Sequence, residues 1–477
     1  MRDIHHFIDG QQTAGQGSER GAVFNPTTGE QQAQVALGST ADVDSAVAAA
    51  KAAFPEWAAT TPLRRARILF KYKALLDEHR DELARLIASE HGKVFSDAQG
   101  EVTRGIEVVE YACGMPHLQK GEHSMNVGTG VDSYSMYQPV GVCAGITPFN
   151  FPAMVPMWMY PIALVCGNTF ILKPSERDPS APMLAAELLK EAGLPDGVFN
   201  LVNGDGLNVG AYLSAHPDID MVSFTGSTRA GIEVAKNAAP TVKRVAQELG
   251  GKSANIILDD ACFEEAISRD AFEMCLNSGQ SCNAGTRMLV PRDRMDEAAR
   301  LAELGMDQLS VGDPQDLANT VGPVASEAQW IKIQELIQVG IDEGATLVCG
   351  GCGRPDGLDT GFYVRPTLFA DVTNDMRIAR EEIFGPVLVI IGYEDDDDAV
   401  DIANDTSYGL SGYISGSHDR ALAVARRIRT GAMHLNGAGP DLHAPFGGYK
   451  QSGNGREWGR HGFEEYLETK AVLGAGS

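Results

Sequence analysis

A regular alternation of strand and helix signals between residues 140 and 239 constrains the fold most strongly. Apolar runs such as VGVCAGITP, VFNLVNG and MVSFTGS are typical of buried strands, and segments such as APMLAAELLKEAG between them are typical of helices. Helices of this length between strands imply parallel pairing with right-handed crossovers. The sequence therefore predicts a doubly wound parallel α/β sheet.

A less regular version of this pattern follows Lys252. Its strand candidates are SANIILDDA, MLVP, TLVCGG, FYVRPTLFAD, VLVIIGY and GAMHLNG. They predict a second α/β domain, with a boundary near Gly250–Gly251. A chain of 477 residues is long enough for two to three domains.

The charge balance excludes several classes of partner. Lys and Arg number 39 against 64 Asp and Glu, a net charge of −25, which argues against a nucleic-acid groove and an anionic membrane surface.

Residues 151–167 are strongly apolar but interrupted by prolines, which favours a buried helix over a membrane span. The first ten residues show no signal peptide. Eight cysteines are too few for a disulfide scaffold and suit a reducing cytoplasm.

One cysteine lies in a setting that suits chemistry. The segment NSGQSCNAG, residues 277–285, is a loop of small residues that presents Cys282. A nucleophilic thiol needs access and a depressed pKa, and we expect such a loop to supply both. The alternative for any cysteine is packing as a small hydrophobic residue, which we assign to the other apolar-context cysteines.

Two further side chains could assist a nucleophile. Glu248 lies in AQELGGKS, where a partly buried carboxylate could act as a general base. Asn150 lies in TPFNFP at the end of a predicted strand, where its neutral amide could stabilise an oxyanion. Glu382, in REEIFGP, is another candidate carboxylate. Ordinary turn chemistry is an equal alternative for each residue taken alone.

Two segments could bind a dinucleotide. In MVSFTGSTRAG a predicted strand ends at Gly226 and Ser227 and opens into a helix, which suits a pyrophosphate. Simple capping of the helix by Ser227 is the alternative. In KPSE, Glu176 and Lys173 follow another strand and could bind ribose hydroxyls, since ligands of such sheets bind at this edge. A surface Lys–Glu pair is the alternative here.

Seven segments together resemble the aldehyde dehydrogenase superfamily. They occur in the order found in that family and cover essentially the whole chain. The segments are TPFNFP, KPSE, FTGSTRAG, ELGGKS, GQSC, EEIFGP and PFGGYKQSGNGRE.

The resemblance implies an NAD-dependent oxidation of an aldehyde to its acid without a metal. The Cys282 thiolate would attack the carbonyl, the Asn150 amide and the Cys282 N–H would hold the oxyanion, and Glu248 would activate the water that hydrolyses the thioester. Glu176 would favour NAD over NADP through like-charge repulsion. The implied cofactor contacts are Thr147, Pro148, Phe149, Lys173, Ser175, Glu176, Gly226, Ser227, Leu249, Glu382 and Phe384.

The resemblance also implies an architecture. Two doubly wound parallel-sheet α/β domains carry a small β extension that joins subunits into a homodimer or homotetramer. The NAD-binding domain would comprise residues 1–117 and 138–249, and the catalytic domain residues 250–455. The oligomerisation segments would be residues 118–137 and 456–477.

The two halves of the chain resemble different subfamilies. Up to about Asp205 the sequence is similar to methylmalonate-semialdehyde dehydrogenases, which pass the acyl group to coenzyme A and whose substrate-binding arginine matches Arg104. Those enzymes lack the glutamate base and carry an arginine before the cysteine, where this chain has Glu248 and Ser281. From Gly206 onward the sequence resembles hydrolytic aldehyde dehydrogenases.

We therefore expect hydrolytic release, with an aldehyde or semialdehyde as substrate and Arg104 and Ser281 near it. The CoA-acylating reaction is the alternative. A recombined or engineered chain would also account for the two resemblances. A cysteine hydrolase or acyltransferase would need a histidine partner for Cys282, for which His434 and His443 are the nearest candidates. A non-catalytic protein of this fold is the remaining interpretation.

Overall fold

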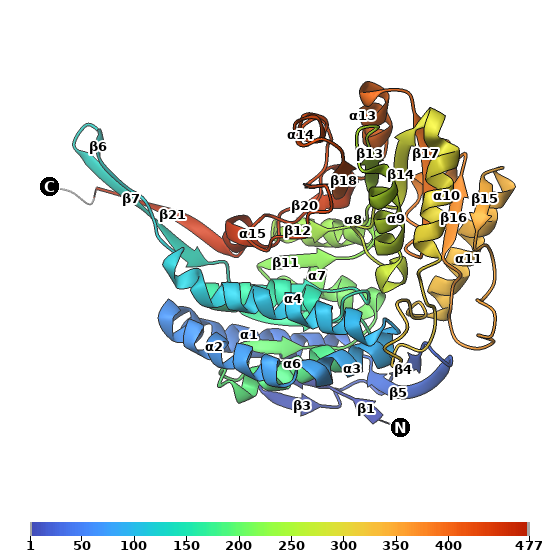
Figure 1. The fold of residues 1–477 in the computed structure, drawn as a ribbon. Helices are drawn as coiled ribbons and strands as arrows, with labels where there is room; N and C mark the ends of the chain where they lie inside the picture. Colours follow the sequence, from blue (N-terminus) through green and yellow to red (C-terminus); the bar gives the residue numbers. More distant parts are fainter. Residues whose placement is uncertain (1, 475–477) are drawn as a thin grey trace.

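The computed structural model describes residues 2–474 and contains two large, mostly parallel sheets. Helices pack on both faces of each sheet, and two small three-stranded sheets lie at the periphery (Figure 1). The predicted α/β class with two doubly wound sheets is confirmed.

The first sheet has eight strands, of which the central five are parallel. Four of these five strands are buried along their whole length, as expected when helices cover both faces. In spatial order the strands are β20 (Gly453–Asn454), β12 (Arg244–Glu248), β11 (Met221–Thr225), β8 (Val142–Ile146), β9 (Thr169–Lys173), β10 (Phe199–Leu201), β2 (His6–Ile8) and β3 (Gln11–Thr13).

Two hydrophobic clusters cover the two faces of this sheet. The larger one joins α2 to α6, and the other joins α1, α7 and α8 to the opposite face. Helix α5 is buried at all 13 positions, which accounts for the apolar segment in the sequence. No helix among residues 2–474 has the length and apolar character needed to cross a bilayer. The helices are α1 (Thr40–Ala59), α2 (Pro62–Glu78), α3 (Arg80–His91), α4 (Phe95–Gly114), α5 (Met154–Cys166), α6 (Ser180–Glu191), α7 (Ala211–Ala215) and α8 (Thr228–Ala238).

The second sheet has seven strands, all parallel except β15 at one edge. Helices α9 and α10 pack on one face, and α11 to α14 pack on the other. In spatial order the strands are β15 (Thr346–Cys349), β16 (Thr367–Ala370), β17 (Val387–Tyr393), β14 (Arg287–Pro291), β13 (Ala254–Ile257), β18 (Ser411–Ser415) and β19 (Ala432–Leu435). The helices are α9 (Phe263–Met274), α10 (Met295–Met306), α11 (Glu327–Asp342), α12 (Arg377–Arg380), α13 (Asp396–Asn404) and α14 (His418–Ala425).

One small sheet projects from the body as an arm (Figure 1). It consists of β6 (His123–Gly128), β7 (Val131–Pro139) and β21 (Leu467–Leu473), all antiparallel. The arm overlaps the segments 118–137 and 456–477 and extends to Pro139, whereas residues 456–466 pack on the body through α15 (Gly459–Glu465), which contacts α5. Residues 475–477 of the predicted segment, and residue 1 of the predicted first domain, lie outside the described residues.

A second small sheet and a short edge strand complete the fold. The sheet consists of β1 (Arg2–Ile4), β5 (Glu30–Ala36) and β4 (Arg20–Asn25). Strand β20, within the predicted catalytic segment 250–455, pairs with β12 of the first sheet. It satisfies the backbone groups of an edge that would otherwise be open.

Candidate active site

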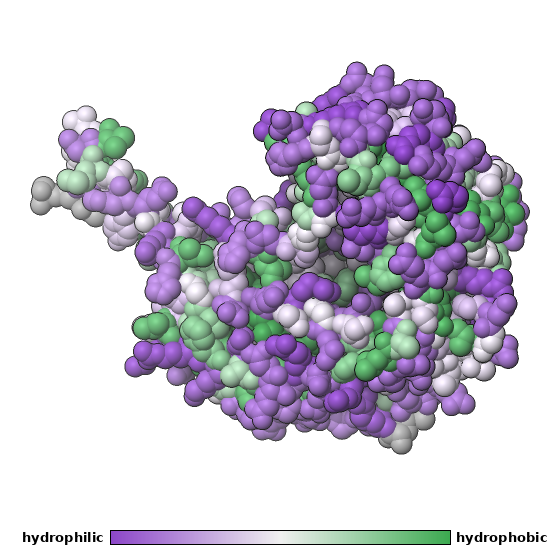
Figure 2. Space-filling model, in the orientation of Figure 1, coloured by the Kyte–Doolittle hydropathy of each residue, from purple (hydrophilic) through white to green (hydrophobic). Residues whose placement is uncertain are grey.

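A cavity of about 330 Å³ lies where the two large sheets meet. Figure 2 shows that the surface is hollowed between the two parts of the molecule that carry these sheets. Residues from segments far apart in the sequence therefore share one space. The predicted site residues that line it are Arg104, Pro148, Phe149, Asn150, Gly226, Ser227, Glu248, Leu249, Ser281, Cys282, Glu382 and Phe384.

The other four predicted residues lie outside this lining, at the same carboxyl edge of the first sheet. The Thr147 backbone N–H donates to the Lys173 carbonyl at 3.1 Å, where β8 and β9 end side by side. The Lys173 ammonium pairs with the Glu176 carboxylate at 3.0 Å, and the Ser175 hydroxyl accepts from the Arg177 N–H. The Lys–Glu pair is therefore formed, and a ribose contact by these residues stays a prediction.

Cys282 lies on a loop with an unusual backbone. Asn277 and Ser278, just upstream, adopt left-handed conformations with φ of 53° and 54°, which side-chain-bearing residues rarely adopt. Gly279 follows with φ of 67°, and a Cβ there would lie 2.1 Å from the Gly385 carbonyl oxygen. Such strained segments persist where the surroundings fix them, often at functional sites.

The Cys282 thiol does not have the depressed pKa expected from its loop. Burial, together with the carboxylates of Glu382 and Glu248, raises the pKa of Cys282 to about 12. The backbone N–H groups of Cys282 and Asn283 act in the opposite sense but do not prevail. The expectation was wrong because the loop folds into the interior beside two acids.

Glu248 is the last residue of β12 and is buried at the cavity wall. Within residues 2–474, neither of its carboxylate oxygens has a hydrogen-bond partner. Burial, followed by the nearby Glu457 carboxylate, raises the pKa of Glu248 well above its usual range. A buried polar group without a partner is costly and uncommon in proteins. Glu248 is therefore able to bond a ligand or water in the cavity.

The glycines after Glu248 allow the two sheets to approach. A Cβ on Gly250 would lie 2.5 Å from Glu382 Oε2, and one on Gly251 would lie 2.4 Å from the Cys282 carbonyl oxygen. The Gly251 N–H donates to Glu382 Oε1 at 3.0 Å. Burial raises the pKa of Glu382. The Gly-Gly pair thus brings the strand carrying Glu248 against the Cys282 loop.

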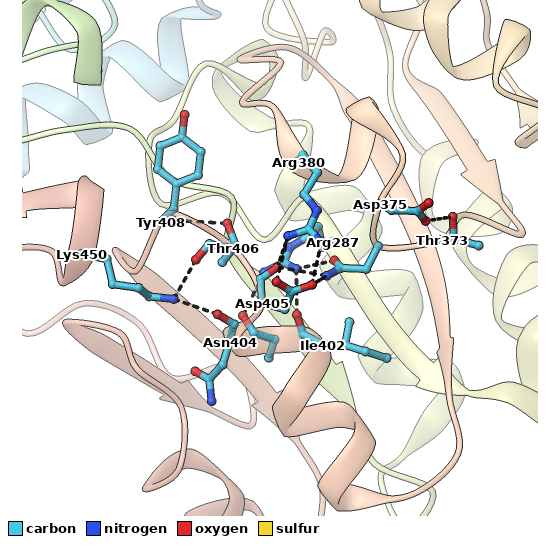
Figure 3. A network of polar contacts seen from close by, with 12 residues as sticks. Arg287, Thr373, Asp375, Arg380, Ile402, Asn404, Asp405, Thr406, Tyr408 and Lys450 are labelled. Carbon is cyan, nitrogen blue, oxygen red and sulfur yellow. Dashed lines mark hydrogen bonds and ion pairs between the residues drawn. The ribbon is translucent and has the colours of Figure 1, made fainter.

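A polar network around Arg287, shown in part in Figure 3, also contacts the next residue, Lys252. The buried Arg287 guanidinium donates to the Lys252 carbonyl at 3.0 Å. It also donates to the Ile402 carbonyl at 3.1 Å. Lys450 donates to the Asn404 and Thr406 carbonyls at 3.0 Å each. These cations satisfy carbonyls at the C-terminal end of α13, where the helix dipole favours positive charge. The network fixes the chain that follows Gly250–Gly251.

Asn150 is buried and also lines the cavity. Its side-chain amide donates one N–H to the Gln280 carbonyl at 3.1 Å, and an amide has two such hydrogens. The bond ties Asn150 to the loop that carries Cys282. The amide has a second N–H with which it can donate to a further acceptor.

Ser227 fulfils the capping role considered above and also lines the cavity. Its hydroxyl accepts from the Ala230 N–H at 3.3 Å at the start of α8. The first-turn N–H groups of α8 thus lie at the cavity margin, beside the buried Thr225 hydroxyl, which has no hydrogen-bond partner among residues 2–474. These groups can bind an anionic ligand.

Several lining residues were not predicted. Gln329 and Lys332 come from α11; Lys332 donates to the Glu382 carbonyl at 2.8 Å and Gln329 donates to the Phe384 carbonyl at 2.8 Å. They hold the turn that carries Glu382. In the sequence, Gln329 and Lys332 stand out only as two polar residues on an amphipathic helix, and such residues usually face solvent. Further lining residues missed are Phe151, Met154, Val155, Pro440, Phe446 and Trp458.

A second cavity of about 290 Å³ adjoins the first. Arg104, Phe151, Ser281 and Asn283 line both, so Cys282 lies where they meet. The second cavity also contains acidic and aromatic side chains, including Asp97, Asp270, Glu273 and Tyr413.

The histidines required for a hydrolase lie elsewhere. His434 stacks on Tyr413 and His443 pairs with Asp441, and neither histidine lines either cavity. Within residues 2–474 no group of three or more His, Cys, Asp or Glu side chains is arranged to hold a metal ion.

Comparison with known proteins agrees with this geometry. Residues 13–472 match the Aldehyde dehydrogenase family. A Pseudomonas protein named 3-succinoylsemialdehyde-pyridine dehydrogenase is 49% identical over 99% of both chains. The structure is similar to aldehyde dehydrogenase C of Pseudomonas syringae, a cysteine-to-alanine mutant with NAD+ and octanal, at 49% identity, TM-score 0.96, and 99% and 97% coverage. It is also similar to an NAD+ complex of an aldehyde dehydrogenase from Bacillus cereus, at 37% identity, TM-score 0.95, and 99% and 96% coverage.

Proposed function

Since the chain belongs to the aldehyde dehydrogenase family, we propose that it oxidises an aldehyde to the carboxylic acid with NAD. One observation carries the proposal: the Cys282 thiol, the Asn150 amide and the unpartnered Glu248 carboxylate line one cavity from three separate segments. These are a nucleophile, an oxyanion donor and a base.

The larger cavity suits the cofactor. The start of α8 offers N–H groups to a pyrophosphate, the buried Thr225 hydroxyl has no hydrogen-bond partner among residues 2–474, and the Glu382 carboxylate can accept from a ribose hydroxyl. Lys173 and Glu176 would bind the second ribose at the sheet edge, and Phe384 would contact the nicotinamide. The similar structures from Pseudomonas syringae and Bacillus cereus are themselves NAD+ complexes.

The smaller cavity suits the aldehyde. Its lining includes Ser281 and Asn283, the two neighbours of Cys282 in the chain, and Arg104 and Ser281 line both cavities. We assign these two residues to substrate binding. The names of similar proteins, a pyridine-bearing semialdehyde dehydrogenase and an octanal complex, indicate that substrates larger than propanal belong in a test panel.

The residues would then act in sequence. The Cys282 thiolate adds to the aldehyde carbonyl, and the oxyanion accepts from the Asn150 amide and the Cys282 N–H. NAD, when bound, supplies the hydride acceptor that this oxidation requires. Glu248 in its ionised form takes a proton from the water that hydrolyses the resulting thioester. A carboxylate whose pKa is raised by burial is a stronger base than one in water.

The alternative acyl acceptor is coenzyme A. Arg104 supports it, because this residue matches the semialdehyde dehydrogenases that use CoA and lines both cavities. Glu248 supports hydrolysis, because a free carboxylate at the cavity wall can activate water. We favour hydrolysis because Glu248 and Ser281 line the same cavity as Cys282.

The test is NADH formation from a panel of aldehydes, each with and without CoA. The panel contains propanal, octanal, succinate semialdehyde and 3-succinoylsemialdehyde-pyridine. We expect turnover that CoA does not increase, with release of the free acid. Strict dependence on CoA with an acyl-CoA product would favour the alternative, and no turnover on any member would contradict the proposal.

We also propose the assembly and setting that the sequence indicates. Residues 1–117 and 138–249 would bind NAD and residues 250–455 would supply the nucleophile. The arm would pair with another subunit in a homodimer or homotetramer. All eight cysteines lie within the described residues and are free thiols, which supports a cytoplasmic location.

A further inference from the structure

A buried ion pair lies directly beneath the segment that carries Asn150. The Lys93 ammonium, in the short connection between α3 and α4, contacts the Glu101 carboxylate of α4 at 2.6 Å. Both side chains are fully buried, at 0% exposure. Burial lowers the pKa of Lys93, while Glu101 acts to raise it. Neither residue lines the cavities described above.

The pair binds the Asn150 segment at both of its ends. Lys93 donates to the Asn150 carbonyl oxygen at 2.7 Å, and its ammonium lies 4.2 Å from the centre of the Phe151 ring. Glu101 Oε1 accepts from the backbone N–H groups of Ala153 at 2.9 Å and Met154 at 3.2 Å, at the start of α5. Residues 150–154 are thus held by a single charged pair.

The same face of α4 also holds the nucleophile loop. Asp97, one turn before Glu101, accepts from the Asn277 backbone N–H at 2.9 Å. The Asn277 side chain donates to the Asn150 carbonyl at 3.2 Å and to the Gln280 carbonyl at 3.0 Å. Hydrogen bonds from α4 therefore hold the Asn150 segment and the Cys282 loop in a fixed position relative to each other.

Stability alone does not account for this arrangement. Burying two charges costs free energy that their mutual attraction only partly returns, and apolar residues of similar volume often serve equally well. The pair does fix the orientation of residues 150–154, because Lys93 and Glu101 each form hydrogen bonds with defined backbone groups of this segment. The side chain of Asn150 takes its direction from the backbone that Lys93 fixes.

We propose that Lys93 and Glu101 are positioning residues that aim the Asn150 amide at the oxyanion formed on Cys282, an inference that rests on the proposed function. Donors of this kind act only when preorganised, and a shift of about 1 Å can cost two orders of magnitude in rate. The ion pair acts through Asn150 and touches neither substrate nor cofactor.

The first test replaces each partner and measures steady-state kinetics. Lys93→Met and Glu101→Gln should each lower kcat by about 10- to 100-fold, because the oxyanion donor is displaced but still present. The KM for NAD should change by less than about twofold, since α8 and Glu382 are untouched. Glu110→Gln, an exposed carboxylate on the same helix, is the matched control and should leave kcat unchanged.

A double-mutant cycle with Asn150→Ala gives the decisive result. If Lys93 acts through Asn150, Lys93→Met should change kcat by less than about twofold once the amide is gone. An equal loss of kcat in both backgrounds would overturn the proposal, because it would show a general structural effect. A folded Lys93→Met enzyme with unchanged kcat would overturn it as well.

A readout independent of turnover separates this inference from the proposed function. Hydrogen exchange should accelerate at least about tenfold in peptides covering residues 147–154 of Lys93→Met, and not in Glu110→Gln. Unchanged exchange there would overturn the positioning role even if the wild type oxidises aldehydes. Absence of aldehyde oxidation by the wild type would contradict the proposed function instead. If Lys93→Met does not fold, Lys93→Met/Glu101→Gln removes both charges together and serves the same measurements.

Discussion

At the scale of single residues, the site is built from acids and a thiol that lie away from water. Cys282 and Glu248 are both pushed toward their protonated forms by burial, and the Glu382 carboxylate adds to the effect on the thiol. Without a bound cation the thiolate is therefore scarce at neutral pH. The positive charge of the oxidised nicotinamide would favour the thiolate, which couples reactivity to cofactor binding.

The reaction of Cys282 with iodoacetamide should show this directly. With the pKa of Cys282 near 12, the thiolate fraction rises about tenfold per pH unit below that value, so the alkylation rate should rise by that factor from neutral pH to about pH 10. Glu382→Gln removes a neighbouring negative charge, lowers the thiol pKa and should speed the reaction at any pH in this range. Mass spectrometry of the Cys282 peptide measures both rates.

Cys282→Ser provides the blank for that experiment, since Cys262 and Cys352 are also exposed to the reagent. A rate for Cys282 that levels off below about pH 9 in the cofactor-free protein would contradict the raised thiol pKa.

Residue types at this site could be predicted from sequence, whereas their environments could not. Small-residue loops around Cys282 and the Gly-Gly pair after Glu248 are visible as patterns. The thiol pKa depends on Glu382, a hundred residues away, and no local pattern carries that contact. Lys93 and Glu101 were missed for a different reason: they lie eight residues apart, but charged residues near the start of a helix are usually solvated, and only the fold buries this pair.

At the scale of elements, the arm has apolar side chains that no other part of residues 2–474 covers. Its strands β6, β7 and β21 lie apart from both large sheets (Figure 1). It exposes apolar side chains that a lone subunit would leave in water: Met125 at 74%, Val127 at 84% and Leu473 at 71%. Exposed apolar patches of this kind mark interaction surfaces.

Charge on the arm should therefore change the assembly state. If the arm joins subunits as proposed, the wild type should sediment as an oligomer and Met125→Asp/Val127→Asp as a smaller species, because two carboxylates would be buried in the subunit contact. Leu317→Asp, at a similarly exposed apolar position on the body (80%), is the matched control and should sediment like the wild type. A monomeric wild type, or an unchanged double variant, would contradict an arm-mediated oligomer.

Helices and strands could be predicted where the pattern of apolar residues was strong. They could not be predicted where a strand forms only by pairing with a strand distant in the sequence. The buried strands β8, β9 and β11 follow from continuous apolar runs between helices. Strand β20 has two residues and no pattern of its own, and it forms because β12 needs a partner on its open side. The limit of β21 at Leu467 likewise follows from pairing with β7, which sequence does not show.

At the scale of the whole molecule, the active site depends on how the two large sheets meet. Glu248 ends a strand of the first sheet, and Cys282 belongs to a loop leading into β14 of the second. Gly250 and Gly251 permit their approach, since a Cβ on either would collide with Glu382 or with the Cys282 carbonyl. Base and nucleophile would then act on one substrate although each belongs to a different sheet.

The most direct test of this shared action is the pre-steady-state NADH signal of Glu248→Gln, supplied with NAD and the preferred aldehyde without CoA. Cys282 and Asn150 remain, so acylation should proceed and deacylation should stall. We expect a burst of about one NADH per subunit, slow turnover afterwards, and an acyl adduct on the Cys282 peptide that Cys282→Ser lacks. Steady turnover of Glu248→Gln at the wild-type rate, with no burst and no adduct, would contradict the role of Glu248 as the base that acts with Cys282.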